Sequence, residues 1–143
     1  MNRIVIGALA LALIGGAASA IAQSSVYTTI NAQSGKLVRL GAYAGLNRDC
    51  SQTRLPKIKV TESPKHGVFV VRSGKASIKR DGRCPAGTEA EVQLVFYQSH
   101  TNYIGEDSVS YEVRAGDRLR TFSIGLSVKA GAPPRKRPGT SDL

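Results

Sequence analysis

The sequence predicts an all-β protein, a β-sandwich of about seven antiparallel strands that is held by one disulfide. Three observations lead to this prediction. Between Gln23 and Lys129, segment after segment alternates apolar and polar residues with period two, which is typical of half-buried strands. No stretch of this region keeps a helical period. The chain has two cysteines, Cys50 and Cys84, both within the same region. Many short strands separated by turn residues are the profile of a sandwich.

The expected strands follow one another along the chain, each recognised by its alternation. In the fifth, Val92, Leu94 and Phe96 alternate with polar neighbours and Val95, which predicts one apolar face. In the seventh, Leu119 is out of step with the later apolar positions, so a bulge or a late strand start is expected near Arg120. The seven segments are 26–30, 38–40, 58–60, 68–71, 92–96, 109–113 and 122–128.

The longest irregular stretch, 41–54, contains Cys50. Long loops in compact domains are usually functional or need holding in place. A disulfide from Cys50 to Cys84 would tie this loop to the turn at 80–84. The alternatives are a redox pair or a metal site, but redox pairs are close neighbours in sequence, and His66 and His100 complete no zinc pattern. We therefore predict a structural disulfide.

The first 22 residues have the order of a secretory signal peptide. Arg3 gives a positive start, an apolar core follows, and small residues precede Gln23. Cleavage after Ala22 is preferred and cleavage after Ala20 is the second choice. A retained membrane anchor is the alternative, since this apolar stretch is just long enough to span a bilayer. The prediction is an exported domain, secreted or periplasmic, at 23–129, and an oxidising compartment supports the disulfide.

The chain is basic. Without Arg3, 19 of its 20 Lys and Arg residues remain against 10 acidic residues, a net charge of +9. Outside the cytoplasm, this charge would attract an anionic envelope component, or it would only keep the protein soluble. The Pro- and Gly-rich segment 130–143 is expected to be a disordered basic tail. The candidate contacts with an anionic surface are Lys57, Lys59, Arg118, Arg120, Arg135, Lys136 and Arg137.

Several short motifs between 60 and 113 occur in a recognisable order. The first is a turn with Pro64, His66 and Gly67, the next is Phe96-Tyr97, and the last runs through Tyr103, Gly105 and Asp107 to a strand with Tyr111. In this order they resemble the bacterial Ig-like or cadherin-like repeats of surface adhesins and other exported proteins. The resemblance implies an Ig-like sandwich with a binding or structural role. It covers about half of the domain, in a single copy, and it brings no calcium site because the acidic linkers of cadherins are absent.

The residues of the first and last motifs also have a physical explanation. Ser63 and Pro64 suit the first positions of a type I turn, and Gly67 can take the positive φ that follows. Gly105 allows backbone conformations that other residues resist. The Asp107 carboxylate can accept hydrogen bonds from backbone N–H groups two residues on. These features predict structural roles for the motif.

No pattern of residues indicates catalysis. His66 lies in a turn and His100 in a polar loop, and neither has the sequence context of a nucleophile or a metal helix. Glu89 and Glu91 form no inferable catalytic pair. No phosphate-binding glycine loop is present, and basic residues are not interleaved with aromatic ones as in nucleic-acid binding. The sequence therefore predicts neither an enzyme nor a cofactor, a metal or a small-molecule substrate.

Two functional hypotheses follow. The first is an exported Ig-like binding, adhesion or structural module that contacts an anionic envelope component through its basic face and the 41–54 loop. The second is a small periplasmic inhibitor or accessory protein that docks on another envelope protein.

Overall fold

The computed structural model describes residues 23–78 and 84–131, and within these ranges it has seven strands and no helix. The predicted fold class is confirmed. The predicted signal peptide at 1–22 and the basic residues Arg135, Lys136 and Arg137 lie outside the described residues. The strands are β1 (Gln23–Gln33), β2 (Leu37–Ala44), β3 (Lys57–Glu62), β4 (Gly67–Ser77), β5 (Glu89–Ser99), β6 (Gly105–Ala115) and β7 (Arg118–Lys129).

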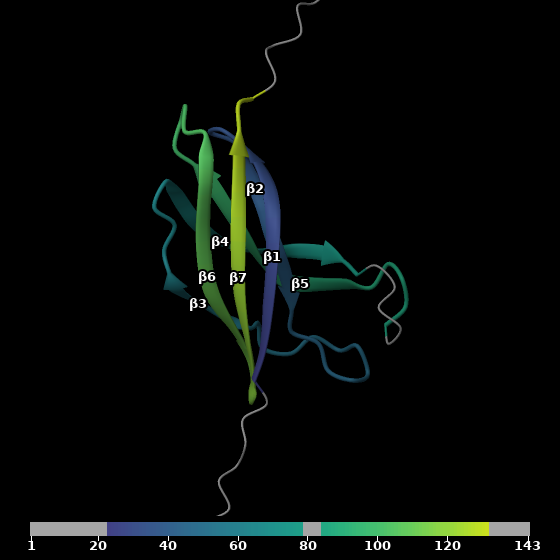
Figure 1. Cartoon of the computed structure of the whole chain (residues 1–143). Helices are drawn as coiled ribbons and strands as arrows, with labels where there is room; N and C mark the ends of the chain where they lie inside the picture. The colour runs from purple at the N-terminus through teal and green to yellow at the C-terminus, as the bar shows by residue number, and fades with distance from the viewer. Residues whose placement is uncertain (1–22, 79–83, 132–143) are drawn as a thin grey trace, which may run out of the picture.

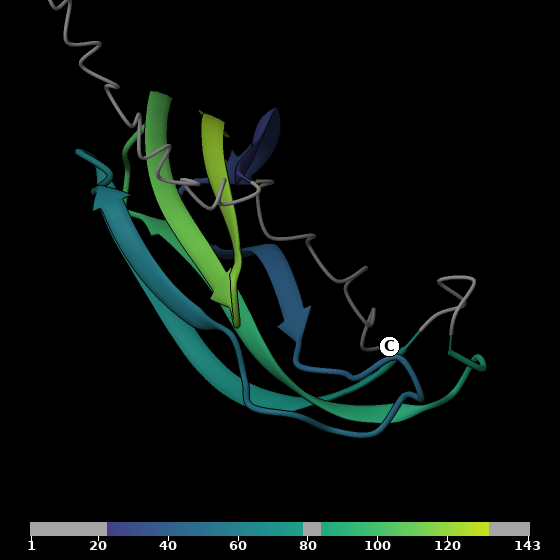
Figure 2. The same ribbon diagram turned by 90° about the horizontal axis from the view of Figure 1, so that it is seen from below.

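The strands form two sheets. Sheet A has the order β1-β7-β6-β3, and sheet B has the order β2-β5-β4. Figure 1 shows β6, β7 and β1 running together in front, with β4 and β5 crossing behind them and extending beyond β1. Seen from below in Figure 2, the two sheets diverge toward the end of β2, where the start of β5 and the end of β4 also lie. The sandwich is therefore closed at one end and splayed at the other.

Five strand pairs hold the two sheets, and four of them are antiparallel as predicted. The exception is β1, which pairs with β7 in parallel along its whole length, from Gln23 opposite Leu119 to Gln33 opposite Lys129. A parallel pair needs a long crossover connection. Here the other five strands supply that connection, since β1 and β7 are the first and last strands of the domain.

Aromatic and β-branched side chains from both sheets fill the core. Tyr97 of sheet B and Tyr111 of sheet A are both fully buried. The Tyr111 ring stacks on Phe122, with centroids 5.2 Å apart and an interplanar angle of 14°. The other large buried side chains are Val95, Val109, Leu126 and Val128.

The prediction that β5 has one apolar face is wrong, because β5 buries residues on both of its faces. Val95 and Tyr97 belong to the main core, whereas Phe96 points away and lies under the Arg72 guanidinium, 6.0 Å from the ring centroid. Val92 is also buried, but it lies outside the main core cluster. The first half of β5 extends beyond sheet A (Figure 1), and there the Glu91 N–H donates a hydrogen bond to Gln52 of the segment between β2 and β3.

The bulge or late start expected near Arg120 is also absent. β7 begins at Arg118, and its register with β6 runs without interruption from Arg118 to Val128. Side chains two apart share a face of a strand. Arg118 and Arg120 therefore lie on the same face as Phe122, Ile124 and the rest of the core-facing row.

Candidate functional site

The splayed end of the sandwich holds a groove of about 1150 Å³. It is lined by the end of β2, the turn between β6 and β7, the start of β3 and the segment that joins β2 to β3. We name this joining segment, residues 45–56, the wall segment. Six of the lining residues are basic: Arg48, Arg54, Lys57, Arg114, Arg118 and Arg120.

The described lining residues of the groove carry positive charge only. All six basic side chains are exposed, and no carboxylate is among the lining residues within 23–78 and 84–131. The nearest carboxylates in sequence, Asp49 and Asp117, adjoin Arg48 and Arg118 without lining the groove. Within residues 23–78 and 84–131, none of the six side chains forms an ion pair or a hydrogen bond. Like charges gathered on one surface raise its electrostatic potential and attract anions. The groove therefore has the electrostatic character of an anion-binding site.

Arg118 and Arg120 occupy positions that continue the core-facing row of β7. Elsewhere in this row the side chains are apolar and buried, as for Ile124 and Leu126. At the start of β7, however, sheet B no longer covers sheet A, and the inner face of the strand opens into the groove. The sandwich therefore supplies the floor of the groove, and this part of the floor is cationic.

Hydrogen bonds within the wall segment fix its shape. Thr53 N–H donates to the Gly45 carbonyl at 2.8 Å, and Leu46 and Gln52 form an isolated antiparallel bridge. At the tip, the Asp49 carboxylate accepts hydrogen bonds from the Ser51 N–H at 3.1 Å and from the Ser51 hydroxyl at 2.6 Å. These bonds hold Arg48 and Arg54 on one structured loop.

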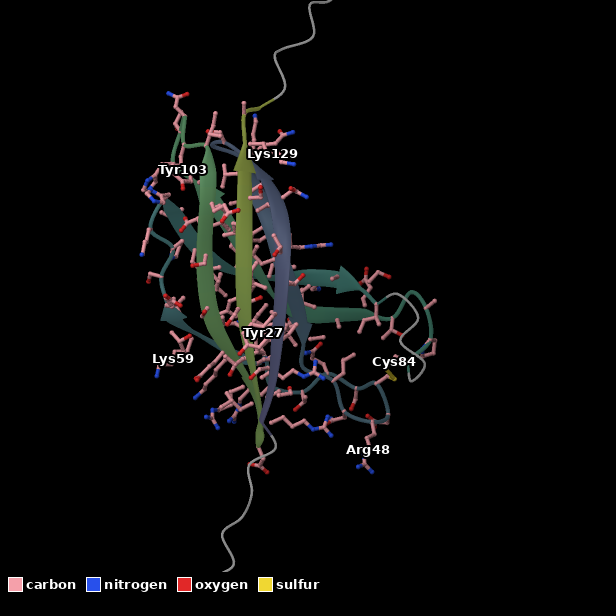
Figure 3. All side chains as sticks on the ribbon, in the orientation of Figure 1. Tyr27, Arg48, Lys59, Cys84, Tyr103 and Lys129 are labelled. Atoms are coloured by element: carbon pink, nitrogen blue, oxygen red, sulfur yellow. A yellow bond between two sulfur atoms is a disulfide. The ribbon has the colours of Figure 1, made fainter. Side chains whose placement is uncertain are left out.

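The disulfide and one glutamine fix the wall segment to sheet B. Cys50 and Cys84 are bonded as predicted, with Cα atoms 5.7 Å apart. The Gln52 amide oxygen accepts a hydrogen bond from Glu91 N–H at 2.8 Å, and its amide nitrogen donates to the Gly45 carbonyl at 2.8 Å. Figure 3 shows Cys84 beside the loop that carries Arg48. Covalent and hydrogen-bonded ties therefore support the same wall of the groove.

Tyr43 lies where the groove meets the core. Its hydroxyl is 2.8 Å from the Tyr111 hydroxyl. Burial is the main cause that raises the pKa of Tyr43 far above its ordinary value, and the bond to Tyr111 adds to it, while the nearby Arg120 charge opposes it. Tyr43 is therefore neutral at physiological pH, and it adds no negative charge to the groove.

At the opposite end of the sandwich, the motif residues converge on the carboxylate of Asp107. It accepts hydrogen bonds from the backbone N–H groups of Lys65 and His66, both at 2.9 Å, and from the Tyr97 hydroxyl at 2.9 Å. A fourth bond comes from the N–H of Ser108 at 2.9 Å. The expected bond to a residue two positions on is therefore replaced by one to the next residue and three to distant ones. Asp107 fastens the turn around Pro64 and Gly67 to the start of β6.

Burial opposes ionisation of Asp107, which is only 8% exposed. The three backbone N–H groups and the Tyr97 hydroxyl stabilise the carboxylate more strongly, so the pKa of Asp107 is lower than its ordinary value. The His66 ring stacks on Tyr103, with centroids 4.1 Å apart and an interplanar angle of 7°. The Tyr103 hydroxyl donates to the Glu106 carbonyl at 2.6 Å, and Gly105 next to it has a φ of 140°. This end is built from mutually satisfied structural contacts.

The structure brings together three of the four basic residues singled out within the described ranges. Lys57, Arg118 and Arg120 line the groove, whereas Lys59 does not. Lys59 lies opposite Glu112 in the register of β3 and β6, on the outer face of sheet A. Lys57 and Arg114, which lie opposite each other two positions away, share that face and line the groove from that side, whereas Arg118 and Arg120 line it from the inner face. Figure 3 places Lys59 and Arg48 apart from one another, on opposite sides of the molecule.

Sequence analysis missed three residues of the groove. Arg48 and Arg54 belong to the irregular stretch that was singled out for Cys50, and Arg114 immediately precedes the β6–β7 turn. A signal was present, because the stretch 41–54 carries two arginines, Arg48 and Arg54. Their proximity to β7 depends on the strand order, which the sequence did not provide.

The described residues contain neither a metal-binding cluster nor a membrane-spanning helix. Across 23–78 and 84–131, no three His, Cys, Asp or Glu side chains are placed so that they could hold a metal ion. The same ranges contain no helix with the length and hydropathy of a membrane span.

Comparisons with known proteins give no family. No protein-family model matches the chain, and no curated protein matches it. One similar solved structure is the solution structure of amebosin, at 17% identity and a TM-score of 0.41, covering 75% of this chain and 98% of that one. Another is PbICP-C in complex with falcipain-2, at 16% identity and a TM-score of 0.34, covering 81% of this chain and 96% of that one. Neither likeness is close enough to support an argument about function.

Proposed function

We propose that this protein is an exported, non-catalytic binding module that captures an anionic partner in the basic groove. The observation that carries the proposal is the set of six exposed cationic side chains around one groove with no carboxylate among the lining residues. The first of the two sequence hypotheses, contact with an anionic envelope component, thereby acquires a defined surface.

The chemistry of the lining supports this function. Five of the six cations are arginines, whose planar guanidinium groups form paired hydrogen bonds with carboxylates and phosphates. Because these groups lack partners within the described residues, an anion gains their interactions without first breaking internal ion pairs. The mutual repulsion of the cations is relieved at the same time.

Export is the second part of the proposal. The order of charged, apolar and small residues in 1–22 and the Cys50–Cys84 disulfide both support an oxidising compartment. The Ig-like resemblance supports a module of the adhesive or structural kind. Mass spectrometry of the protein recovered from the envelope or the medium should give a chain that begins at Gln23 or Ile21. A chain that begins at Met1 would contradict export by cleavage.

Chromatography on immobilised heparin, a generic polyanion, tests the groove. Arg118→Glu/Arg120→Glu reverses two charges in the groove, and Arg39→Glu/Lys75→Glu makes the same change in total charge at exposed strand positions outside it. We expect the groove variant to elute at clearly lower salt than both the wild type and the control variant. Equal elution of the two variants would show that total charge, rather than the groove, determines retention. Circular dichroism of each variant verifies that it is folded.

A further inference from the structure

The lining between the cations indicates which class of anion the groove takes. Five of its twelve non-basic residues are alanine or glycine: Ala42, Ala44, Gly45, Ala115 and Gly116. Small side chains allow another backbone to approach closely. The larger apolar lining residues, such as Leu55, Pro56 and Val113, are buried or half-buried, so they offer little exposed apolar area to an acyl chain, which needs an apolar pocket to be removed from water. The floor of the groove therefore suits an extended chain better than a lipid tail.

The aromatic content of the groove argues against nucleic acid. Proteins that bind single strands stack bases on exposed aromatic rings. Among the described residues, Tyr43 is the only aromatic one that lines the groove. Its ring packs against Phe122 with centroids 5.3 Å apart and against Tyr111 at 6.3 Å, and its hydroxyl is bonded to Tyr111. The groove thus provides cations without a stacking platform.

A strand edge borders the groove. β2 is the outermost strand of sheet B and pairs only with β5. Its last three residues, from Ala42 to Ala44, line the groove. An edge strand has backbone N–H and C=O groups on its free side, and an extended peptide can bind there by adding a strand.

We propose that the groove binds an extended acidic segment of another protein, which pairs with the free edge of β2 and places Asp or Glu side chains on the groove arginines. This inference rests on the proposed function and names its partner class. Carboxylates on such a segment meet arginine side chains from two sides, Arg118 and Arg120 on the floor and Arg54 on the wall segment. Backbone pairing with β2 positions the bound segment, and the charge pairs with the arginines select acidic sequences.

Selection from a displayed library of random peptides of about eight residues, the length of an ordinary strand, tests the proposal. The wild-type domain should enrich sequences with Asp or Glu at alternating positions. Arg118→Glu/Arg120→Glu should abolish that enrichment, and Lys59→Glu/Lys75→Glu, which makes the same charge change at exposed positions outside the groove and away from β2, should retain it. A selected peptide should bind the groove variant about tenfold or more weakly than the control variant, because charge pairs are lost.

Hydrogen exchange of the wild-type domain with a selected peptide tests the strand pairing. Slower exchange of free backbone amides within 42–44 is expected, and unchanged exchange there would overturn the β2 pairing. If no acidic sequences are enriched while heparin or vesicles of anionic phospholipid still bind in a groove-dependent manner, the peptide class is wrong and the proposed function survives. If no anionic probe distinguishes the groove variant from the control, the proposed function fails as well.

Discussion

At the scale of single residues, Asp107 has the largest structural effect that the contacts identify. One carboxylate satisfies three backbone N–H groups and the Tyr97 hydroxyl, and it joins the β3–β4 turn to β6. We expect Asp107→Asn to lower the free energy of unfolding by about 2 to 4 kcal/mol, since an amide cannot accept all of these bonds. Chemical denaturation measures the change. Glu106→Gln, the same change at the exposed neighbour, is the control, and equal midpoints for the two variants would contradict this role.

The depressed pKa of Asp107 also gives a pH dependence with a defined sign. The unfolded state takes up the proton first as the pH falls, so the ionised carboxylate stabilises the fold fully above its ordinary pKa of about 3.9. That stability is lost progressively as the pH decreases from there through the lower pKa of the folded state. Unfolding measured between neutral and strongly acidic pH should therefore show a steeper acid loss for the wild type than for Asp107→Asn. Parallel curves would exclude Asp107 as the source.

The sequence allowed part of this residue-level description. Pro64, His66, Gly67 and Asp107 were identified as a structural turn and loop, and the N–H groups of Lys65 and His66 in this turn do bond to that carboxylate. The positive φ expected for Gly67 is wrong, because Gly67 already belongs to the extended strand β4. The sequence could not identify the donors, because Lys65 N–H and the Tyr97 hydroxyl reach Asp107 only through the folding of three separate strands.

At the scale of elements, the wall segment is the part on which the groove depends. Gly45 is buried, and a Cβ atom at this position would strike the Arg54 carbonyl oxygen. Gly45→Ala should therefore displace the wall and lower the free energy of unfolding by about 1 to 3 kcal/mol, and it should also weaken retention on heparin. Gly131→Ala, where a Cβ meets nothing within 4 Å, is the control. Unchanged stability and retention in Gly45→Ala would contradict the tight approach of the two chain segments.

The disulfide should matter both for stability and for binding. Its cysteines are 34 positions apart, and a loop of this length is stabilised by about 3 to 4 kcal/mol when it is closed. We expect Cys50→Ser/Cys84→Ser to lose this amount in denaturation experiments and to bind heparin more weakly, because Arg48 loses its fixed position. Reduction of the wild type by dithiothreitol should reproduce the variant and leave the variant itself unchanged. A wild type that is unaffected by complete reduction would contradict the role of the disulfide.

The alternation of β7 shows why a correct pattern led to a wrong local prediction. The apolar row from Phe122 to Val128 is real, and Leu119, which is out of step with it, suggested a bulge or a late strand start near Arg120. The register is intact because the core does not extend that far, so core-facing positions there meet the groove. Similarly, β5 buries Val95 in the main core and Val92 outside it. Period-two patterns identify strands, but what covers each face is decided by the arrangement of the sheets.

At the scale of the whole molecule, the groove is a product of the strand order. Its cations come from four places in the chain, and they meet because β3 and β7 both flank β6 while the wall segment crosses from sheet B to sheet A. The net positive charge was evident from the composition, but the gathering of basic residues at one groove was not. Fold class, disulfide and three of the groove cations followed from local patterns, and the groove itself required the complete topology.

The two ends of the sandwich differ in how far their polar and charged groups are paired. The Asp107 end is internally satisfied, with its polar groups bonded to one another. The splayed end has six cations without partners among the described residues, arranged around small side chains and a strand edge. This asymmetry is the reason that we propose the splayed end as the binding site, whereas the contacts around Asp107 hold the fold together.

The most direct test is a titration of the isotopically labelled domain with a short heparin oligosaccharide, followed residue by residue by NMR. The account predicts that the largest shift changes occur at Arg48, Arg54, Arg114, Arg118 and Arg120, that they saturate together, and that they diminish as salt is raised. Changes centred on exposed cations elsewhere, such as Arg39 and Lys75, or spread evenly over the basic surface, would contradict a specific anion-binding groove.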